Sequence, residues 1–302
     1  MRRKYILTDL AGGLGNQIFL LEMSRFLHSL IDGKVYLNKH HIDLTHSNGK
    51  STIENFLMPT GIQFVDYGKF YAWILNRTKR YLKYLNLIPQ NLILILDDSD
   101  SRLCKKRIID LAKNKKPKLT FIFGFWQNFD FWIESSNYFL KNRSSKFIEL
   151  ERDLVKTDPI IFHYRLGQSN DLWESGWGAL SPQFLQTSLE HLRVNCGLEL
   201  GPVWVFSNDL FHARNLILTK FVDSNYDLRF IDDSELTPAE VFMLFSKSNH
   251  LICSNSTMSI SAAKISKAQN IIIPKVLSIK GDFIKSTPEG WIKIDPIWLS
   301  YI

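Results

Sequence analysis

Short apolar segments alternate with helical patterns along most of the chain. The first apolar segment, Tyr5–Leu10, is followed by a glycine turn at 12–15 and by a helical pattern that Gly33 ends. A second apolar segment follows at 35–37. This order of strand, glycine turn, helix and strand is typical of a βαβ unit, so it predicts a parallel sheet at the start of the chain.

The alternation becomes more regular in the second half. Strands are expected at 159–164, 202–206, 228–231, 250–253 and 271–273, and helices at 183–193, 209–220, 238–246 and 258–266. Residues 141–158 carry many charges and little apolar periodicity, which favours a domain boundary there. We therefore predict an α/β fold of two domains, residues 1–155 and 156–302, the second with a doubly wound sheet.

The composition narrows the range of partners. The 302 residues are 45% hydrophobic and 22% charged, as in globular proteins, and the net charge of +7 favours nucleotide diphosphates, acidic lipids or nucleic acid as ligands. The three cysteines are far apart and predict neither a disulfide framework nor a metal site. No apolar run is long enough for a membrane span, and Asp9 interrupts the first one, so we expect a cytoplasmic protein.

Two segments are rich in cations. Residues 69–88 combine five Lys or Arg with several aromatic residues and no acid, and residues 102–118 are also basic. The first segment suits an interfacial helix on the anionic inner face of a membrane, and it equally suits a packed helix with a solvated basic face. Nucleic-acid binding would leave the strand-end residues described next without a role, and no nucleic-acid motif is present, so we expect no nucleic-acid partner.

Four polar clusters stand at the end of a predicted strand or follow it. They are Gly12–Gln17, His163–Arg165, Ser207–Asp209 and Ser254–Thr257. Each cluster also has a plain structural interpretation as a tight turn, a structural histidine or a helix cap. In an open parallel sheet, however, ligands bind beyond the carboxyl ends of the strands, so together the clusters predict a cleft for a phosphorylated ligand.

The side chains in these clusters suit a sugar nucleotide. The amides of Asn16 and Gln17 offer donors and acceptors for sugar hydroxyls. The guanidinium of Arg165 has the fork geometry that grips a diphosphate. Hydroxyl and N–H groups of Ser256 and Thr257, at the start of a predicted helix, form an anion cradle.

The clusters resemble the signatures of the α-1,2-fucosyltransferases, in the order found in that family. Gly12–Phe19 is similar to the N-terminal signature, and His163–Gly167 resembles the His-x-Arg-Arg-Gly-Asp motif. Phe206–Asp209 resembles Phe-Ser-Asp-Asp, and Ser254–Ala263 resembles Asn-Ser-Thr-Phe-Ser-Trp-Trp. The stretch Phe123–Trp132 is similar to the Gly-Tyr-Trp-Gln-Ser stretch of the family.

This resemblance implies a GT-B-like architecture, in which two Rossmann-like domains face each other across a cleft. It implies GDP-fucose as donor, inversion at the anomeric carbon and no obligatory metal or other cofactor. The expected acceptor is an oligosaccharide or lipid-linked glycan, with the 2-hydroxyl of galactose as the site of transfer in surface polysaccharide synthesis. The implied donor-binding residues are His163, Arg165, Asn208, Asp209, Asn255, Ser256 and Thr257. Those implied on the acceptor side of the cleft are Gly13, Gly15, Asn16, Gln17, Trp126 and Gln127.

The chain departs from the family motifs in ways that leave alternatives open. Gln168 replaces the acid of the second motif and cannot act as a general base. The carboxylates of Asp171 and Glu174 therefore become the candidates for the catalytic base. Asn208 replaces an aspartate, which permits a different GDP-sugar, and loss of the base permits a non-catalytic sugar-nucleotide or glycan binder. The acidic pairs in 98–100 and 232–233 are interpreted as turn residues rather than as metal ligands.

Overall fold

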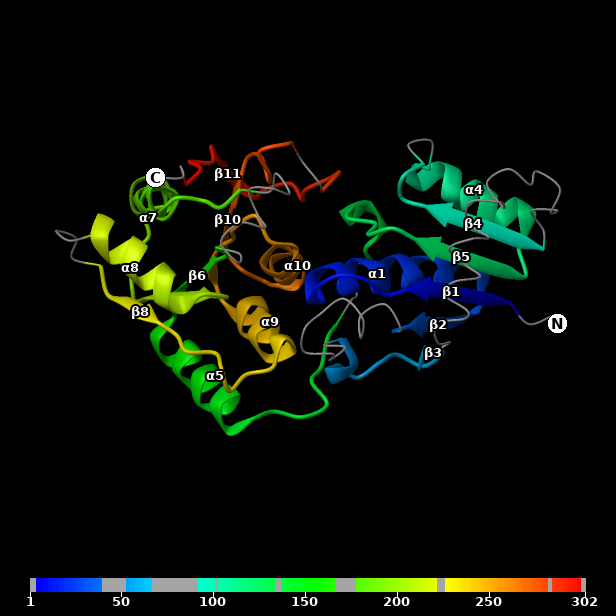
Figure 1. Cartoon of the computed structure of the whole chain (residues 1–302), viewed down its shortest axis with the longest axis horizontal. Coiled ribbons are helices and arrows are strands. Elements are labelled where there is room, and N and C mark those ends of the chain that lie inside the picture. The colour runs from blue at the N-terminus through cyan, green and yellow to red at the C-terminus, as the bar shows by residue number, and fades with distance from the viewer. Residues whose placement is uncertain are drawn as a thin grey trace. The chain divides into compact units, whose positions relative to one another are not determined.

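The chain folds into two compact units, residues 1–141 and 142–302, each built around a parallel sheet (Figure 1). The computed structural model describes residues 4–39, 53–66, 92–100, 103–133, 137–166, 178–221, 226–281 and 284–299. The cationic segment 69–88 lies outside these residues, so its contact with a membrane stays a prediction.

The described part of the first unit has a five-stranded sheet in the order β3-β2-β1-β5-β4. The strands are β1 (Tyr5–Asp9), β2 (Lys34–Asn38), β3 (Ile62–Val65), β4 (Ile93–Asp97) and β5 (Leu119–Phe123). The helices are α1 (Leu14–Ile31) and α4 (Lys105–Lys115), with short 3-10 turns η1 (Ile53–Asn55) and η2 (Phe129–Phe131). The predicted opening βαβ unit is confirmed, because β1 pairs in parallel with β2 across α1.

A buried acid joins α1 to the segment that follows β5. Glu22 is fully buried, and its carboxylate accepts hydrogen bonds from Tyr138 Oη at 2.5 Å and from Arg25 Nη1 at 2.9 Å. Burial and the adjacent Glu22 charge raise the pKa of Tyr138, so this hydroxyl stays a donor. The ring of Phe19, one turn earlier, packs at 5.1 Å from Phe129. These contacts hold the chain beyond β5 against α1.

The described part of the second unit has a six-stranded sheet in the order β11-β10-β9-β6-β7-β8. The strands are β6 (Ile160–Tyr164), β7 (Val203–Ser207), β8 (Leu228–Phe230), β9 (His250–Ile252), β10 (Asn270–Pro274) and β11 (Ile292–Ile294). The helices are α5 (Ser145–Thr157), α7 (Pro182–Val194), α8 (Leu210–Lys220), α9 (Pro238–Lys247) and α10 (Thr257–Ile265). All the strand pairs are parallel, which confirms the predicted doubly wound sheet.

Helices cover both faces of the second sheet (Figure 1). Helices α7 and α8 bury Phe184 and Ile217 in one core cluster with Phe162 and Tyr164 of β6. Helices α5, α9 and α10 pack together on the other side, where Phe245 of α9 lies 5.2 Å from the ring of His163. Because side chains alternate along a strand, His163 faces the second group of helices while its neighbours face the first.

The structure corrects the interpretation of residues 141–158, which contain helix α5. Phe147, Leu150 and Leu154 form its buried stripe, and the Ser144 side chain caps it by accepting from the Phe147 N–H. Lys247 of α9 pairs with Glu151, so the helix packs within the second unit. The compact units accordingly divide at 141/142, whereas the sequence placed the division at 155/156.

Candidate functional site

The strand order of the second sheet creates a switch point between β6 and β9. The chain runs outward from β6 through β7 to β8, returns to form β9 on the other side of β6, and continues outward to β11. The register pairs Ile160 with His250 and Phe162 with Ile252. Loops leave in opposite directions at such a point and open a crevice at the carboxyl edge, where open α/β sheets bind ligands. Two of the four predicted clusters follow the strands at this point.

His163 is the buried part of the cluster at the end of β6. Its side chain is 7% exposed, and its Nδ1 atom has no hydrogen-bond partner among the described residues. Burial, together with the nearby charge of Arg165, lowers the pKa of His163 from its ordinary 6.5 to about 3. The imidazole is therefore neutral at physiological pH. It suits a hydrogen bond to a ligand and is too weak a base to take a proton from a hydroxyl.

The pKa of His163 predicts an acid-sensitive fold. Below about pH 6.5 the unfolded chain binds a proton at this residue, whereas the folded chain does not until about pH 3. The free energy of unfolding should therefore fall by about 1 kcal/mol per pH unit from this residue as the pH falls from 7 to 5, and the contribution should fade to zero as the pH rises above about 7.5. Urea denaturation at pH 7, 6 and 5 should show a slope shallower by that amount in His163→Gln. An identical slope in the two proteins would show that His163 titrates normally.

Arg165 is the exposed part of the same cluster. Its guanidinium forms no ion pair or hydrogen bond with any residue that the structure describes. The next residue, Leu166, donates its backbone N–H to Asn208 Oδ1 at 3.1 Å, which ties the ends of β6 and β7 together. Asn208 thus keeps its amide N–H groups for another partner. The Arg165 guanidinium is therefore a cation at the carboxyl edge of the sheet that has no partner among the described residues.

Both carboxylate oxygens of Asp209 contact another residue of the protein, His212. It caps α8 by accepting from the His212 N–H at 3.1 Å, and its other oxygen contacts His212 Nδ1 at 2.7 Å. Burial opposes ionisation, but the hydrogen bonds from His212 outweigh it and lower the pKa of Asp209. The helix-cap interpretation therefore describes what Asp209 does in this structure.

The start of α10 carries the fourth cluster. Ser254, Asn255 and Ser256 are all nearly buried, and the Ser254 hydroxyl has no partner among the described residues. Ser256 is the N-cap residue of α10, yet its side chain makes no capping hydrogen bond. Asn255 Nδ2 donates to the carbonyl of Gly178 at 2.8 Å. The buried Ser254 hydroxyl and the uncapped N-terminus of α10 are together suited to an anion.

The first sheet has a switch point as well, between β1 and β5. The chain runs outward from β1 through β2 to β3, and β5 lies on the other side of β1. Gly12–Gln17 follows β1, and Gly124–Gln127 follows β5. Gln127 Nε2 donates to Asn16 Oδ1 at 2.8 Å, so the structure joins two predicted acceptor-side segments.

The glycine turn after β1 has a steric requirement at Gly12. Its φ of +71° is in the left-handed region, and a Cβ there would lie 2.4 Å from Asn16 Nδ2. Gly13, the N-cap of α1, is exposed with open space beside it. Gly15 and Gln17 are buried, and Gln17 donates to the Gly12 carbonyl and accepts from the Ile53 N–H. Gly13 and Asn16 therefore remain accessible, while Gly15 and Gln17 support the turn.

Trp126 is placed in the interior of the first unit. Its side chain is 1% exposed, and its indole N–H donates to the Phe123 carbonyl at 2.7 Å. Its φ of +50° is unusual for a bulky residue and costs on the order of 1–3 kcal/mol. The residue before it, Phe125, is 42% exposed and was not among the sequence-predicted site residues. The sequence offers no signal for this choice, because both residues are aromatic.

Three further expectations concern the candidate catalytic residues, a metal ion and a membrane span. Asp171 and Glu174 lie outside the described residues, so their role as candidate catalytic bases stays a prediction. Across the described ranges no group of three or more His, Cys, Asp or Glu side chains could hold a metal ion. None of the helices in these ranges is long and apolar enough to span a membrane.

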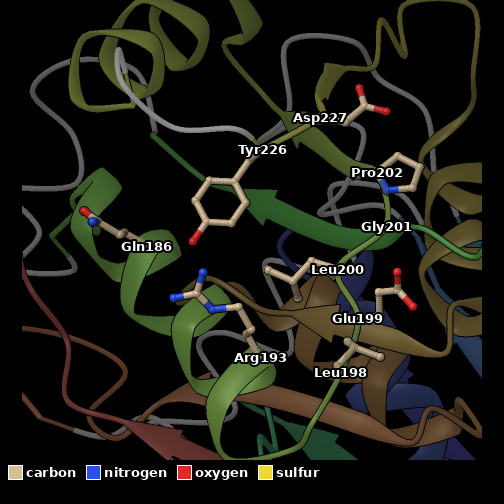
Figure 2. A pocket seen from close by; sticks show the side chains of 9 residues that line it. All are labelled: Gln186, Arg193, Leu198, Glu199, Leu200, Gly201, Pro202, Tyr226 and Asp227. Carbon is tan, nitrogen blue, oxygen red and sulfur yellow. The ribbon is translucent and has the colours of Figure 1, made fainter.

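A pocket of about 810 Å³ lies at the opposite edge of the second sheet (Figure 2). Its lining comes from α7 and from the segments before β7 and β8, and it comprises Gln186, Arg193, Leu198, Glu199, Leu200, Gly201, Pro202, Tyr226 and Asp227. These segments precede their strands, whereas His163 and Ser254 stand at the other ends. The pocket is therefore separate from the candidate site.

Comparisons with known proteins identify the fold. No family model matches the sequence, and no curated protein sequence matches it. Among solved structures, Arabidopsis thaliana FUT1, a mutant in complex with GDP, has a TM-score of 0.52 at 13% identity over 88% of this chain and 69% of its own. The α-1,6-fucosyltransferase NodZ of Bradyrhizobium, soaked with GDP-fucose, has a TM-score of 0.50 at 10% identity over 87% of this chain and 93% of its own. The predicted fold class is confirmed, since the two parallel α/β sheets have the GT-B fold of these fucosyltransferases.

Proposed function

We propose that the protein is an inverting glycosyltransferase that moves fucose from GDP-fucose to a hydroxyl of a glycan acceptor. The 2-hydroxyl of galactose is the expected position, and surface polysaccharide synthesis the expected process. The donor would bind at the β6/β9 switch point and the acceptor at the carboxyl edge of the first sheet. The fold similarity to GDP-bound and GDP-fucose-soaked fucosyltransferases supports the donor class.

One observation carries the proposal. Buried polar atoms without described partners, His163 Nδ1 and Ser254 Oγ, flank the switch point together with the guanidinium of Arg165. Leaving a buried polar group unsatisfied costs roughly 1–3 kcal/mol, so a fold that keeps two of them at a ligand-binding edge favours a bound partner there. A guanidinium and an uncapped helix N-terminus select an anion, and a neutral imidazole suits a phosphate or sugar oxygen.

These residues would act mainly on the leaving group. In an inverting transfer the acceptor oxygen attacks the anomeric carbon of fucose, and the bond from that carbon to the phosphate oxygen breaks. GDP departs with the electron pair, and the acceptor proton passes to a base or to the departing diphosphate. Arg165 and the N-terminus of α10 would stabilise the negative charge that develops on the diphosphate. His163, neutral at this pH, would orient the donor.

A donor screen tests the proposal. Release of GDP from GDP-fucose, GDP-mannose and UDP-glucose would be followed with galactose-terminated acceptors, and GDP binding would be measured by calorimetry. Turnover of GDP-fucose supports the proposal, and turnover of another GDP-sugar favours the alternative donor. GDP binding without any turnover favours a non-catalytic binder. A protein that does not bind GDP contradicts the proposal.

Transfer is proposed to need no metal ion. Arg165 and the helix N-terminus supply positive charge, which a metal ion supplies in other transferases. Turnover should therefore persist in excess EDTA at a rate within about two-fold of the untreated enzyme, a change worth under about 0.5 kcal/mol. Complete loss of turnover that manganese or magnesium restores would contradict this part of the proposal.

The site of action stays a prediction. We propose that the protein works in the cytoplasm, with peripheral contact to the inner face of a membrane, because a lipid-linked acceptor would lie there. The cationic segment 69–88 supports this proposal by its composition alone.

A further inference from the structure

The segment after β5 is held in an unusual backbone conformation. Gly124 has a φ of +93°, and a Cβ there would lie 2.5 Å from the Cβ of Asp98. Trp126 also has a positive φ, and its backbone N–H donates to Asp98 Oδ2 at 3.2 Å. The buried indole is held by its own hydrogen bond to Phe123. Contacts from two sides therefore hold a bulky residue in the left-handed region.

This conformation turns Trp126 inward and leaves Phe125 outside. Phe125 is 42% exposed, whereas the indole of Trp126 is 1% exposed. Exposed aromatic rings occur on any surface, and Phe139 of the same unit is 61% exposed. Phe125 differs in its position, because it lies at the carboxyl edge of the sheet beside the switch point between β1 and β5.

Polar groups suited to a sugar come from the same two segments, which follow β5 and β1. Gln127 is only 8% exposed, and its one hydrogen bond to a described side chain goes to Asn16. This pair keeps the Gln127 carbonyl oxygen as an acceptor and the Asn16 amide N–H groups as donors. Gly13 adds an exposed backbone position with open space around it. An exposed aromatic ring and two paired amides thus belong to the two segments that leave this edge of the sheet.

The carboxyl edge of the first sheet differs in charge from the candidate GDP-sugar site of the second sheet. Neither Gly12–Gln17 nor Gly124–Gln127 contains a charged side chain, whereas the second unit offers Arg165. A pyranose ring has an apolar C–H face that packs on an aromatic π face, and its hydroxyls pair with amides. The two segments thus offer no cation for a phosphate, and the nearby Asp98 carboxylate would repel one, so this edge favours a neutral pyranose.

We propose that Phe125 is the stacking platform of a pyranose-binding subsite, completed by the amides of Asn16 and Gln127. The subsite takes a sugar residue of the acceptor glycan, so the inference rests on the proposed transferase function. Trp126 is a positioning residue that acts through its backbone conformation.

The test uses the full chain and three variants. Phe125→Ala removes the ring, Phe125→Tyr keeps it, and Phe139→Ala removes an exposed ring elsewhere in the unit. Saturation-transfer NMR would give dissociation constants for methyl pyranosides of galactose, glucose and mannose, and calorimetry would give the dissociation constant for GDP. Thermal denaturation would show that each variant is folded.

Phe125→Ala should weaken binding of the preferred methyl pyranoside by about ten-fold or more, while Phe125→Tyr and Phe139→Ala stay within about three-fold of the parent. GDP affinity should be the same in all four proteins. Parental pyranoside affinity in folded Phe125→Ala, or no saturation transfer to any of the three pyranosides in the parent, overturns the inference. So does a loss confined to GDP. If the parent protein does not bind GDP, the proposed function is contradicted. The pyranoside affinities of the variants still decide whether the inference holds.

Discussion

Replacing Arg165 with alanine should weaken GDP binding by roughly ten- to hundred-fold. A hydrogen bond from a charged group contributes about 1.5–3 kcal/mol, and a guanidinium can form two such bonds to a diphosphate. The side chain is exposed and has no partner among the described residues, so its removal should change the melting temperature little. Calorimetric titration with GDP measures the effect. Arg165→Lys, which keeps the charge and loses the fork, should give an intermediate dissociation constant.

Arg193 provides a matched control for this experiment. It is also an exposed arginine of the second unit, but it lies on α7 in the pocket at the opposite edge of the sheet (Figure 2). Arg193→Ala should bind GDP as the parent does. If Arg165→Ala remains folded and keeps the parental affinity for GDP, the diphosphate binds elsewhere.

Replacing Asp171 with asparagine should lower turnover by roughly 100-fold, which is a typical contribution of a positioned general base. Gln168 cannot accept the acceptor proton, and His163 is too weak a base, so Asp171 is the nearest candidate in sequence. The residues on either side of its segment support this choice. The Leu166 N–H donates to Asn208 Oδ1, and the Gly178 carbonyl accepts from Asn255 Nδ2, so both described residues that flank this segment lie at the candidate site. Steady-state rates with saturating donor measure the effect.

GDP affinity separates this role from donor binding. Asp171→Asn should leave the dissociation constant for GDP unchanged, because a base acts on the acceptor hydroxyl. Glu199→Gln, an exposed acid at the opposite edge of the sheet, should keep parental turnover. Glu174→Gln tests the second candidate acid. Near-parental turnover in both Asp171→Asn and Glu174→Gln would show that the base lies elsewhere or that the diphosphate takes the proton.

Most buried strands could be predicted, and the exceptions have physical reasons. Central strands such as β6 and β7 are buried throughout and stand out as apolar runs. Strands β3 and β11 lie at the edges of their sheets, are short and only partly buried, and were not predicted. Strand β4 is a short apolar run, which periodicity alone cannot distinguish from a buried helix. Helix α5 has its three buried positions at the helical spacing of i, i+3 and i+7, but the many charges of its exposed face resemble those of a linker, and it was not predicted.

The chemistry of the candidate site was determined by the sequence itself. Polar residues in the last positions of a buried strand, or directly after it, lie at its carboxyl end, whatever the arrangement of the sheet. This local rule is enough to place His163 and Arg165, and likewise Asn255 and Ser256, at a ligand-binding edge. The residue types then predict an anionic ligand for these residues and sugar hydroxyls as the ligand of Asn16.

Only the tertiary structure decided which clusters meet and which side chains are accessible. The pairing of β6 with β9 joins Ile160 to His250, and no local pattern encodes a hydrogen bond between strands so far apart in the chain. The order of the strands in each sheet therefore determines where the two switch points lie. Accessibility depends on packing from distant residues in the same way: Asp98 and the Phe123 carbonyl hold Trp126 inward, and this leaves Phe125 at the surface. Two adjacent aromatic residues look alike in a sequence, and only contacts made across the fold assign one to the core and the other to the surface.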